Sequence, residues 1–307
     1  MHRHLHRPSE ADLQQSPGQR ASPVAKSTFS YADFINDPAR SCAVVVHRGM
    51  WQAAPENSLL AIERAIVAGH DIVEIDVRET ADGEYVLVHD DTLERMAGLD
   101  RRPETMSSRD LSSLRLRNRD GGEENVLTDE KLPTLADVLE LTRNRIFIHI
   151  DVKHRDVIPG VIDFARKKGV DQQVDFWAEL KNEADYTWIT ENVFPHKVPF
   201  IAKTRLNVPD GAIGRELMLR LSPLICEVYF DDLDQVASLG IQCKENGTSL
   251  WYNTLDPVAC GRFTDTEAME DPDAIWGRLI DAGISAIQTD FPNELRAFLN
   301  HSEKPSR

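Results

Sequence analysis

The chain is short of the residues that disulfide-stapled, membrane-spanning and secreted proteins need. Its 307 residues include four cysteines, which stand far apart and form no Cys-x-x-Cys pair. We therefore expect reduced thiols in a cytoplasmic protein. No apolar run approaches the roughly 18 residues that cross a bilayer, and the first residues lack the apolar stretch of a secretory signal.

Positive charge is also scarce. The 35 Lys and Arg residues face 51 Asp and Glu residues, which gives a formal net charge of −16. Such a surface disfavours nucleic acid and anionic membranes as partners. We expect a small-molecule ligand instead, and an anionic one has to be drawn in by a local metal ion or basic group. The oligomeric state, a homodimer included, stays open.

Short apolar runs alternate with helical patterns from residue 43 onward. Most of these runs lack a clean polar alternation, which is typical of strands buried on both faces of a parallel sheet. The alternation predicts an α/β fold of the TIM (β/α)8 barrel type. Nine strands are expected, at residues 43–47, 72–77, 85–89, 145–151, 174–178, 199–203, 225–230, 249–254 and 285–289.

Nine strands are one too many for an eight-stranded barrel. Too few residues separate run 72–77 from run 85–89 for a helical crossover, and Asp82-Gly83 lies between them. We therefore expect a hairpin there. Either strand 85–89 joins the barrel antiparallel, or another of the nine lies outside it.

Helical patterns and composition divide the chain further. We expect helices at 58–68, 135–141, 157–168 and 274–282, with Ser58 and Thr134 as N-caps. Residues 1–27 are polar and aperiodic and predict a flexible extension. Residues 28–300 then form a single barrel domain, led by a short helix at 31–36, and residues 301–307 form a tail. A polar insertion at about 93–132, with a short helix at 108–116, covers a site or forms an interface.

Acidic residues end two of the predicted strands. Glu74 and Asp76 are two apart on a strand, so their side chains share one face. Two inward carboxylates repel each other unless a cation neutralises them, and oxygen ligands suit Mg²⁺ or Ca²⁺. Asp151 ends another buried run and completes a candidate site for one divalent cation. Lys153 shares its face and pairs with phosphate or with the carboxylates.

Two histidines also end apolar runs. Imidazole titrates near neutral pH, so His47 and His89 can act as general base and general acid in one turnover. The fork of Arg48 can hold two phosphate oxygens. Glu56 and Asn57 precede the first helix and are placed to coordinate the ion or to orient His47.

At these residues the chain resembles the glycerophosphodiester phosphodiesterase family. The resemblance implies a TIM-barrel enzyme that binds one divalent cation and cleaves a phosphodiester to a phosphomonoester and an alcohol. It implies His47 and His89 as the acid/base pair, Glu74, Asp76 and Asp151 as metal ligands, and Arg48 and Lys153 near the phosphate. The matching motifs are His47-Arg48-Gly49, Pro55-Glu56-Asn57-Ser58, Glu74-Ile75-Asp76-Val77, Asp82-Gly83, Val88-His89-Asp90, Leu132-Pro133-Thr134-Leu135 and Thr289-Asp290-Phe291-Pro292.

The chain departs from the family pattern at two places. Asp151 stands where the family usually has Glu, and the late strand keeps the tryptophan of the family, Trp251, without its usual following Thr. These departures leave the substrate open, so a sugar-phosphodiester hydrolase of the agrocinopine type is an alternative with the same chemistry. Trp251 either stacks on the leaving group or packs in the core. Lys203 and Arg205 either bind the phosphate or the departing alcohol, or lie solvated at a strand end.

Two readings from other classes remain. A catalytically inactive barrel would bind a phosphorylated ligand, although the complete set of histidines, carboxylates and arginine argues against it. A lipid-directed phospholipase D, like the related sphingomyelin-cleaving toxins, is disfavoured because those proteins act outside the cell and carry disulfides.

Overall fold

The structure, a computed structural model, describes residues 29–302. The predicted extension at 1–27 lies outside the described residues, as does the predicted tail from residue 303 onward. The first two residues of that tail belong to the last helix, α12 (Pro292–Ser302). Within the described residues, no helix is long and apolar enough to cross a membrane.

Eight parallel strands close into a barrel. Strand β1 pairs with β11 on one side and with β2 on the other, so the sheet has no open edge at this point. The prediction of a TIM-type barrel is therefore confirmed. The eight strands are β1 (Ala43–Val46), β2 (Ile72–Glu79), β6 (Phe147–Val152), β7 (Val174–Glu179), β8 (Phe200–Arg205), β9 (Ile225–Tyr229), β10 (Ser249–Asn253) and β11 (Ile284–Thr289).

The ninth strand is β3 (Tyr85–Leu87), and it lies outside the closed barrel. Strand β2 is twice as long as β1, with eight residues against four, and its C-terminal part projects beyond β1. Strand β3 pairs antiparallel with that projecting part, from Val77↔Leu87 to Glu79↔Tyr85. The predicted hairpin is thus confirmed. The strand is antiparallel, as the first alternative expected, but it extends the sheet at β2 and does not join the closed barrel. The strand outside the barrel is therefore the hairpin strand itself, and the second alternative is wrong.

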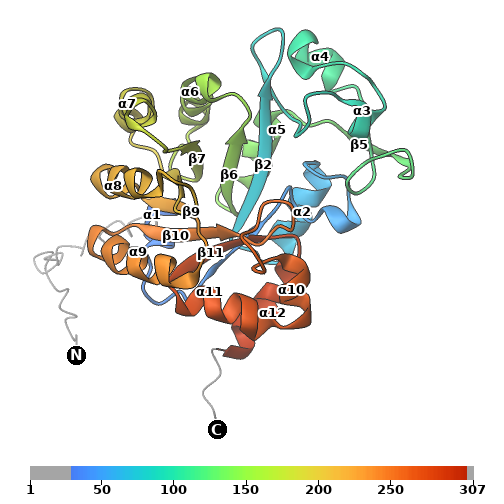
Figure 1. The fold of residues 1–307 in the computed structure, drawn as a ribbon. Helices are drawn as coiled ribbons and strands as arrows, with labels where there is room; N and C mark the ends of the chain where they lie inside the picture. Colours follow the sequence, from blue (N-terminus) through green and yellow to red (C-terminus); the bar gives the residue numbers. More distant parts are fainter. Residues whose placement is uncertain (1–28, 303–307) are drawn as a thin grey trace, which may run out of the picture.

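Helices surround the barrel (Figure 1). Ser58 caps α2 by accepting from the backbone N–H of Ala61, and Thr134 forms a capping box with Asp137 at α5. Both N-caps were predicted from the sequence. The helix predicted at 274–282 appears as a π-helical turn, η5 (Asp273–Gly277), followed by α11. The helices are α2 (Leu59–Val67), α5 (Leu135–Thr142), α6 (Ile158–Lys168), α7 (Glu183–Asn192), α8 (Gly211–Leu221), α9 (Leu233–Asn246), α10 (Asp265–Glu270), α11 (Arg278–Asp281) and α12.

Apolar side chains fill the barrel near the N-terminal ends of its strands. This inner core is separate from the larger core between strands and outer helices, and α1 (Tyr31–Ile35) packs into it through fully buried Tyr31. The ring of Tyr31 stacks on Phe147 at 5.1 Å between ring centroids. The inner core leaves the C-terminal ends of the strands for polar groups, the usual place of a barrel's active site.

The predicted insertion forms a small lobe with its own core. It contains α3 (Glu94–Ala97), α4 (Ser108–Leu111) and the hairpin of β4 (Arg115–Arg117) with β5 (Leu127–Lys131). The predicted helix at 108–116 is therefore shorter, because its last residues enter β4. Figure 1 shows the lobe beside the projecting end of β2. Its apolar residues pack with Val86 and Val88 of the β3 segment.

Candidate active site

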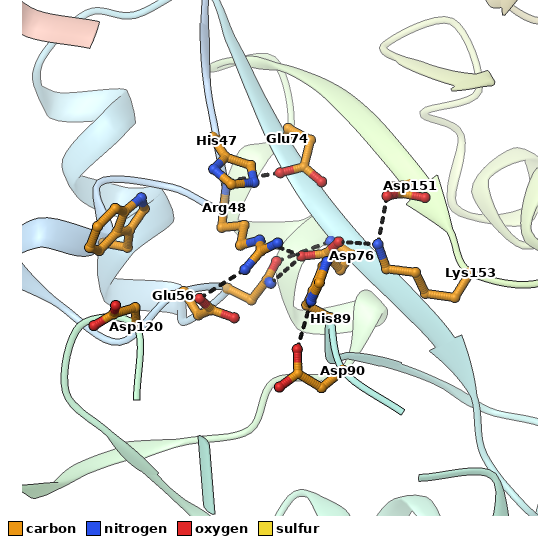
Figure 2. Close-up of polar contacts among 12 residues, drawn as sticks. His47, Arg48, Glu56, Glu74, Asp76, His89, Asp90, Asp120, Asp151 and Lys153 are labelled. Atoms are coloured by element: carbon orange, nitrogen blue, oxygen red, sulfur yellow. Dashed lines mark hydrogen bonds and ion pairs between the residues drawn. The ribbon is translucent and has the colours of Figure 1, made fainter. Parts of the chain in front are cut away.

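Three carboxylates meet at the C-terminal ends of two neighbouring strands. Residues Glu74 and Asp76 lie on β2 and Asp151 on β6, where Asp76 and Asp151 are register partners. One oxygen from each residue lies within 4.8 Å of the other two. Glu74 and Asp76 are 3% and 1% exposed. The three acids whose spacing predicted a metal site therefore do come together (Figure 2).

The carboxylates are not equally compensated by protein cations. The ammonium of Lys153 lies 2.6 Å from Oδ1 of Asp76 and 2.6 Å from Oδ2 of Asp151, and Nε of Arg48 lies 3.2 Å from Oδ2 of Asp76. Burial disfavours ionised Asp76, but Lys153 and Arg48 outweigh it and hold the pKa of that carboxyl well below its usual range. Glu74 instead accepts a hydrogen bond from the backbone N–H of Arg48, at 2.9 Å.

Glu74 shows that the cluster is short of positive charge. Burial, then the neighbouring charge of Asp76, raises the pKa of Glu74 to about 7. A carboxyl at that pKa is half protonated near neutral pH, which is the response of acids crowded together without enough cations. Oxygen ligands at this spacing are the set that a hard divalent cation prefers. The residues present therefore fit a divalent-metal site.

His47 follows β1 and is held by the end of the last strand. Its Nδ1 lies 2.8 Å from Oδ1 of Asp290, and Nε1 of Trp51 donates to the same oxygen at 2.7 Å. Burial disfavours the imidazolium, but Asp290 and Glu74 outweigh it, so the pKa of His47 lies above its ordinary value. With Nδ1 engaged, Nε2 is the ring atom free for proton transfer.

The turn after His47 depends on one glycine. Arg48 and Gly49 both have positive φ angles, 52° and 75°. A Cβ atom on Gly49 would lie 2.8 Å from the backbone and Cβ of Ala61 in α2. Glycine therefore lets the loop pass close to the helix, and the turn directs the Arg48 guanidinium to the acids.

His89 reaches the same site because the β2–β3 hairpin reverses the chain. The backbone N–H of Val88 donates to the carbonyl of Asp76 at 3.1 Å, which brings the next residue level with the acids. Nδ1 of His89 lies 2.7 Å from Oδ1 of Asp90. Figure 2 shows His47 beside Glu74 and His89 between Asp76 and Asp90. Both predicted histidines therefore lie at the carboxylate cluster, each with its own aspartate.

A chain of charged groups links the three clustered carboxylates to His89. Nη1 of Arg48 lies 3.1 Å from Oε2 of Glu56. The carboxylate of Glu56 also accepts two hydrogen bonds from Arg95, at 2.7 and 3.0 Å. Arg95 in turn donates to Asp90 from Nε at 2.7 Å and from Nη2 at 2.9 Å. Glu56 thus pairs with two arginines. It was expected to coordinate the ion or to orient His47, and its described contacts do not include His47.

Asn57 orients one of the three clustered carboxylates. Its Nδ2 donates to Oδ2 of Asp76 at 2.7 Å, and its Oδ1 accepts from the backbone N–H of Asp76 at 3.0 Å. A reciprocal pair of this kind fixes the rotamer of Asp76. The insertion supports the same loop, because the backbone N–H of Glu56 donates to the carbonyl of Arg119 at 2.8 Å.

Lys203 and Trp251 were both predicted to bind the substrate, and the structure places them in different surroundings. Lys203 lies on β8 with its ammonium 3.2 Å from Oε1 of Glu227, and its side chain is 15% exposed. Trp251 is 1% exposed within the inner core, where Nε1 donates to Asn253 at 2.7 Å. The buried position of Trp251 corrects the expectation that it stacks on a leaving group, and agrees with the packing alternative.

Several residues of this site had no assigned role from the sequence. Asp90 and Asp290 stood within motifs, but their pairing with the histidines depends on which strand ends meet. Arg95 lies in the insertion, where charged residues are common. Trp177 on β7 donates from Nε1 to Oδ1 of Asp151 at 2.9 Å. A tryptophan near the end of a buried strand was the only available signal for that contact.

Comparison with known proteins identifies a family. The model described as the glycerophosphoryl diester phosphodiesterase family matches residues 47–194, and a model described as a domain of unknown function matches residues 206–299. A glycerophosphodiester phosphodiesterase from Caldanaerobacter subterraneus is 27% identical over 256 residues, covering 82% of this chain and 95% of the relative.

Solved structures share the fold. A glycerophosphoryl diester phosphodiesterase from Parabacteroides distasonis has a TM-score of 0.69 at 20% identity, covering 90% of this chain and 93% of that one. A phosphodiesterase from Oleispira antarctica, solved with the product sn-glycerol-3-phosphate, has a TM-score of 0.61 at 21% identity and covers 84% and 96% of the two chains. By fold, matched segment and relatives, the chain belongs to the glycerophosphodiester phosphodiesterase family and is a phosphoric diester hydrolase.

Proposed function

We propose that this protein hydrolyses a small glycerophosphodiester to a phosphomonoester and an alcohol, with His47 and His89 as the acid/base pair. The observation that carries the proposal is the matched pairing of both histidines through Nδ1 to Asp290 and Asp90, beside three clustered carboxylates. Each pairing directs the opposite nitrogen, Nε2, to proton transfer. The relative from Caldanaerobacter subterraneus, which bears the family activity in its name, supports the substrate class.

The proposed roles of the basic residues and the histidines follow from their charge and protonation. Arg48 and Lys153 lie at the carboxylates and supply positive charge for a phosphate. One histidine takes the proton from the attacking hydroxyl, and the other gives a proton to the departing alkoxide, which is otherwise a poor leaving group at neutral pH. The nucleophile is water or a neighbouring hydroxyl of the substrate.

We propose that Glu74, Asp76 and Asp151 hold one divalent cation, Mg²⁺ or Ca²⁺. Their oxygens, burial and shared charge suit such an ion. A bound cation supplies positive charge that offsets the charge developing on a phosphoryl oxygen. Asp151 is shorter than the Glu that the family usually has at this position. Its carboxylate is held by Lys153 and Trp177.

Release of phosphomonoester from a substrate panel tests the proposal. The panel contains glycerophosphocholine, glycerophosphoethanolamine, glycerophosphoglycerol, lysophosphatidylcholine and a sugar–phosphate–sugar diester, each with Mg²⁺, with Ca²⁺ and with chelator. Turnover of glycerol diesters that chelator abolishes is the expected result. Turnover of the sugar diester alone would favour the agrocinopine-type alternative. Folded, metal-loaded protein that turns over no member would contradict the proposal and favour a phosphoryl-binding barrel.

The free thiols support a proposal for the compartment. All four cysteines are free and buried, and burial raises the pKa of the Cys42 thiol to about 12. A reactive thiolate is therefore disfavoured, and we propose a cytoplasmic protein that needs no disulfide.

A further inference from the structure

A protein ammonium is seated between two aromatic rings beside the candidate metal site. Nζ of Lys203, on β8, lies 4.7 Å from the ring centroid of Trp177 on β7 and 4.9 Å from that of Tyr229 on β9. The carboxylate of Glu227, also on β9, lies 3.2 Å from the same nitrogen. Two aromatic faces and one carboxylate thus surround a single positive charge.

These groups are the ones that bind cationic headgroups. Aromatic faces attract cations, and quaternary ammonium ligands such as choline are held by several rings together with acidic groups. Here the place is filled by Lys203, whose side chain is 15% exposed and whose partner Glu227 is 5% exposed. A substrate trimethylammonium group would have to displace Lys203 or lie next to its charge.

The box formed by Trp177, Tyr229, Glu227 and Lys203 adjoins the reacting centre. Nε1 of Trp177 donates to Oδ1 of Asp151 at 2.9 Å, so one ring of the box touches a candidate metal ligand. A cavity of 340 Å³ is lined by Asp151, Lys153 and Trp177, among others. Trp177 thus connects this cavity, at the carboxylates, to the box.

Polar groups continue beyond the box. A second cavity, of 520 Å³, is lined by Lys203, Arg205, Asn207, Tyr229 and Asp231, among others. Arg205 stacks on Tyr229 at 4.2 Å from the ring centroid and binds Glu179 at 2.8 Å. Lys203 and Arg205 are each paired with a carboxylate, and Asp231 adds one further acid, so this wall offers both hydrogen-bond donors and acceptors. Hydroxyl groups can bind to both kinds of partner, because each donates and accepts.

We propose that Lys203 determines the leaving group, so that the enzyme accepts a diester whose alcohol is an uncharged polyol and rejects a quaternary ammonium alcohol. The inference rests on the proposed phosphodiesterase function and narrows its substrate class. Lys203 acts by occupying the aromatic box with its own charge.

Paired kinetics test the inference. The ratio of kcat/KM for glycerophosphoglycerol to that for glycerophosphocholine is measured in the wild type, Lys203→Met, Lys203→Arg and Lys167→Met. Wild type should favour glycerophosphoglycerol at least about tenfold, because a cation meets the charge of Lys203. Lys203→Met frees the box and should lower this ratio at least about tenfold. Lys203→Arg keeps the cation and should keep the preference.

Lys167→Met is the matched control. Lys167 carries the same charge and is exposed on α6, away from both cavities, so its loss should leave the ratio unchanged. A wild type that hydrolyses both diesters equally well would overturn the inference without any variant. Equal ratios in wild type and folded Lys203→Met would also overturn it. Absence of turnover of both diesters in every protein would instead count against the proposed function itself.

Free choline gives an independent reading. Choline chloride should inhibit hydrolysis of glycerophosphoglycerol by Lys203→Met, and inhibit wild type at least about tenfold more weakly. If choline inhibited wild type and Lys203→Met equally at the same concentration, the inference that Lys203 fills the box would be wrong.

Discussion

Nδ1 of His47 lies 2.8 Å from Oδ1 of Asp290, a contact between the ends of the first and last barrel strands. Asp290 also accepts from Trp51, so the carboxylate is held from two sides. His89 and Asp90 repeat the arrangement at 2.7 Å on the other side of the acids. An aspartate at Nδ1 fixes the tautomer and orientation of an imidazole and stabilises its charged form.

Loss of either imidazole should remove turnover while leaving the fold intact. We expect His47→Ala and His89→Ala each to lower kcat by about 10²- to 10⁴-fold, the usual contribution of a general acid or base. Steady-state kinetics with glycerophosphoglycerol measure the loss, and thermal unfolding measures the fold. His301→Ala, on the exposed end of α12, should retain full activity. Full activity in folded His47→Ala or His89→Ala would sink the two-histidine mechanism.

Asp290→Asn should impair His47 without removing it. We expect kcat to fall by about 10²-fold or more while KM changes little, because an amide no longer fixes the useful tautomer. Since Asp290 raises the pKa of His47, the limb of the pH–rate profile that reports His47 should move to lower pH. Trp51→Phe removes the other donor to Asp290 and serves as the control, with a smaller loss. An unmoved limb would show that Asp290 does not tune His47.

The sequence predicted those features that depend on short stretches of chain. The nine strands of the main sheet appeared in the sequence as short apolar runs, whereas the β4–β5 hairpin was not predicted. The spacing of Glu74 and Asp76 sufficed to place both acids on one face. The hairpin followed from a connection too short for a helix. Each of these features arises from local geometry that neighbouring residues determine.

Contacts between distant segments were beyond this reasoning. Arg95 and Glu56 meet only because the insertion folds back on the first loop, and His149 meets Asp175 only through the order and register of β6 and β7. Helices α7, α8, α9, α10 and α12 were not predicted. For α7 the reason is its burial, because Ile189 is its one buried residue. A helix that buries so little has no apolar stripe to reveal it.

Metal binding should depend on the protonation of Glu74. Its pKa of about 7 means that protons compete with a cation at lower pH. Without metal, the raised pKa of Glu74 stabilises the folded state. This stabilisation is complete when the pH is below the ordinary carboxyl pKa near 4.5, and it is lost as the pH rises to about 7. Mg²⁺ or Ca²⁺ should therefore raise Tm more at pH 8 than at pH 6.

Glu74→Gln tests the assignment of that pH dependence. The variant should lose most of the metal-induced rise in Tm, whereas Glu63→Gln, at an exposed ion pair with Arg145, should keep it. Calorimetric scans with and without chelator at both pH values measure the effect. An undiminished rise in folded Glu74→Gln would exclude Glu74 as a ligand.

The buried pair of His149 and Asp175 should stabilise the protein in a pH-dependent way. Their atoms lie 2.5 Å apart inside the barrel. Burial disfavours the imidazolium, but Asp175 outweighs it and raises the pKa of His149 to about 9. The stabilisation is thus complete below the unfolded pKa near 6.5 and disappears as the pH rises through about 9.

His149→Gln should therefore lower the free energy of unfolding most at low pH. The pH-dependent part of the difference from wild type should be about 3 kcal/mol at pH 6 and small at pH 10, since each pKa unit corresponds to about 1.4 kcal/mol. Urea unfolding across this range measures it, and groups that titrate equally in both proteins cancel in the difference. His196→Gln, at a partly exposed histidine of the outer surface, is the control for loss of an imidazole outside the barrel. A difference between His149→Gln and wild type that stays constant from pH 6 to pH 10 would mean that His149 is neutral in the folded protein, and that the pair acts by hydrogen bonding alone.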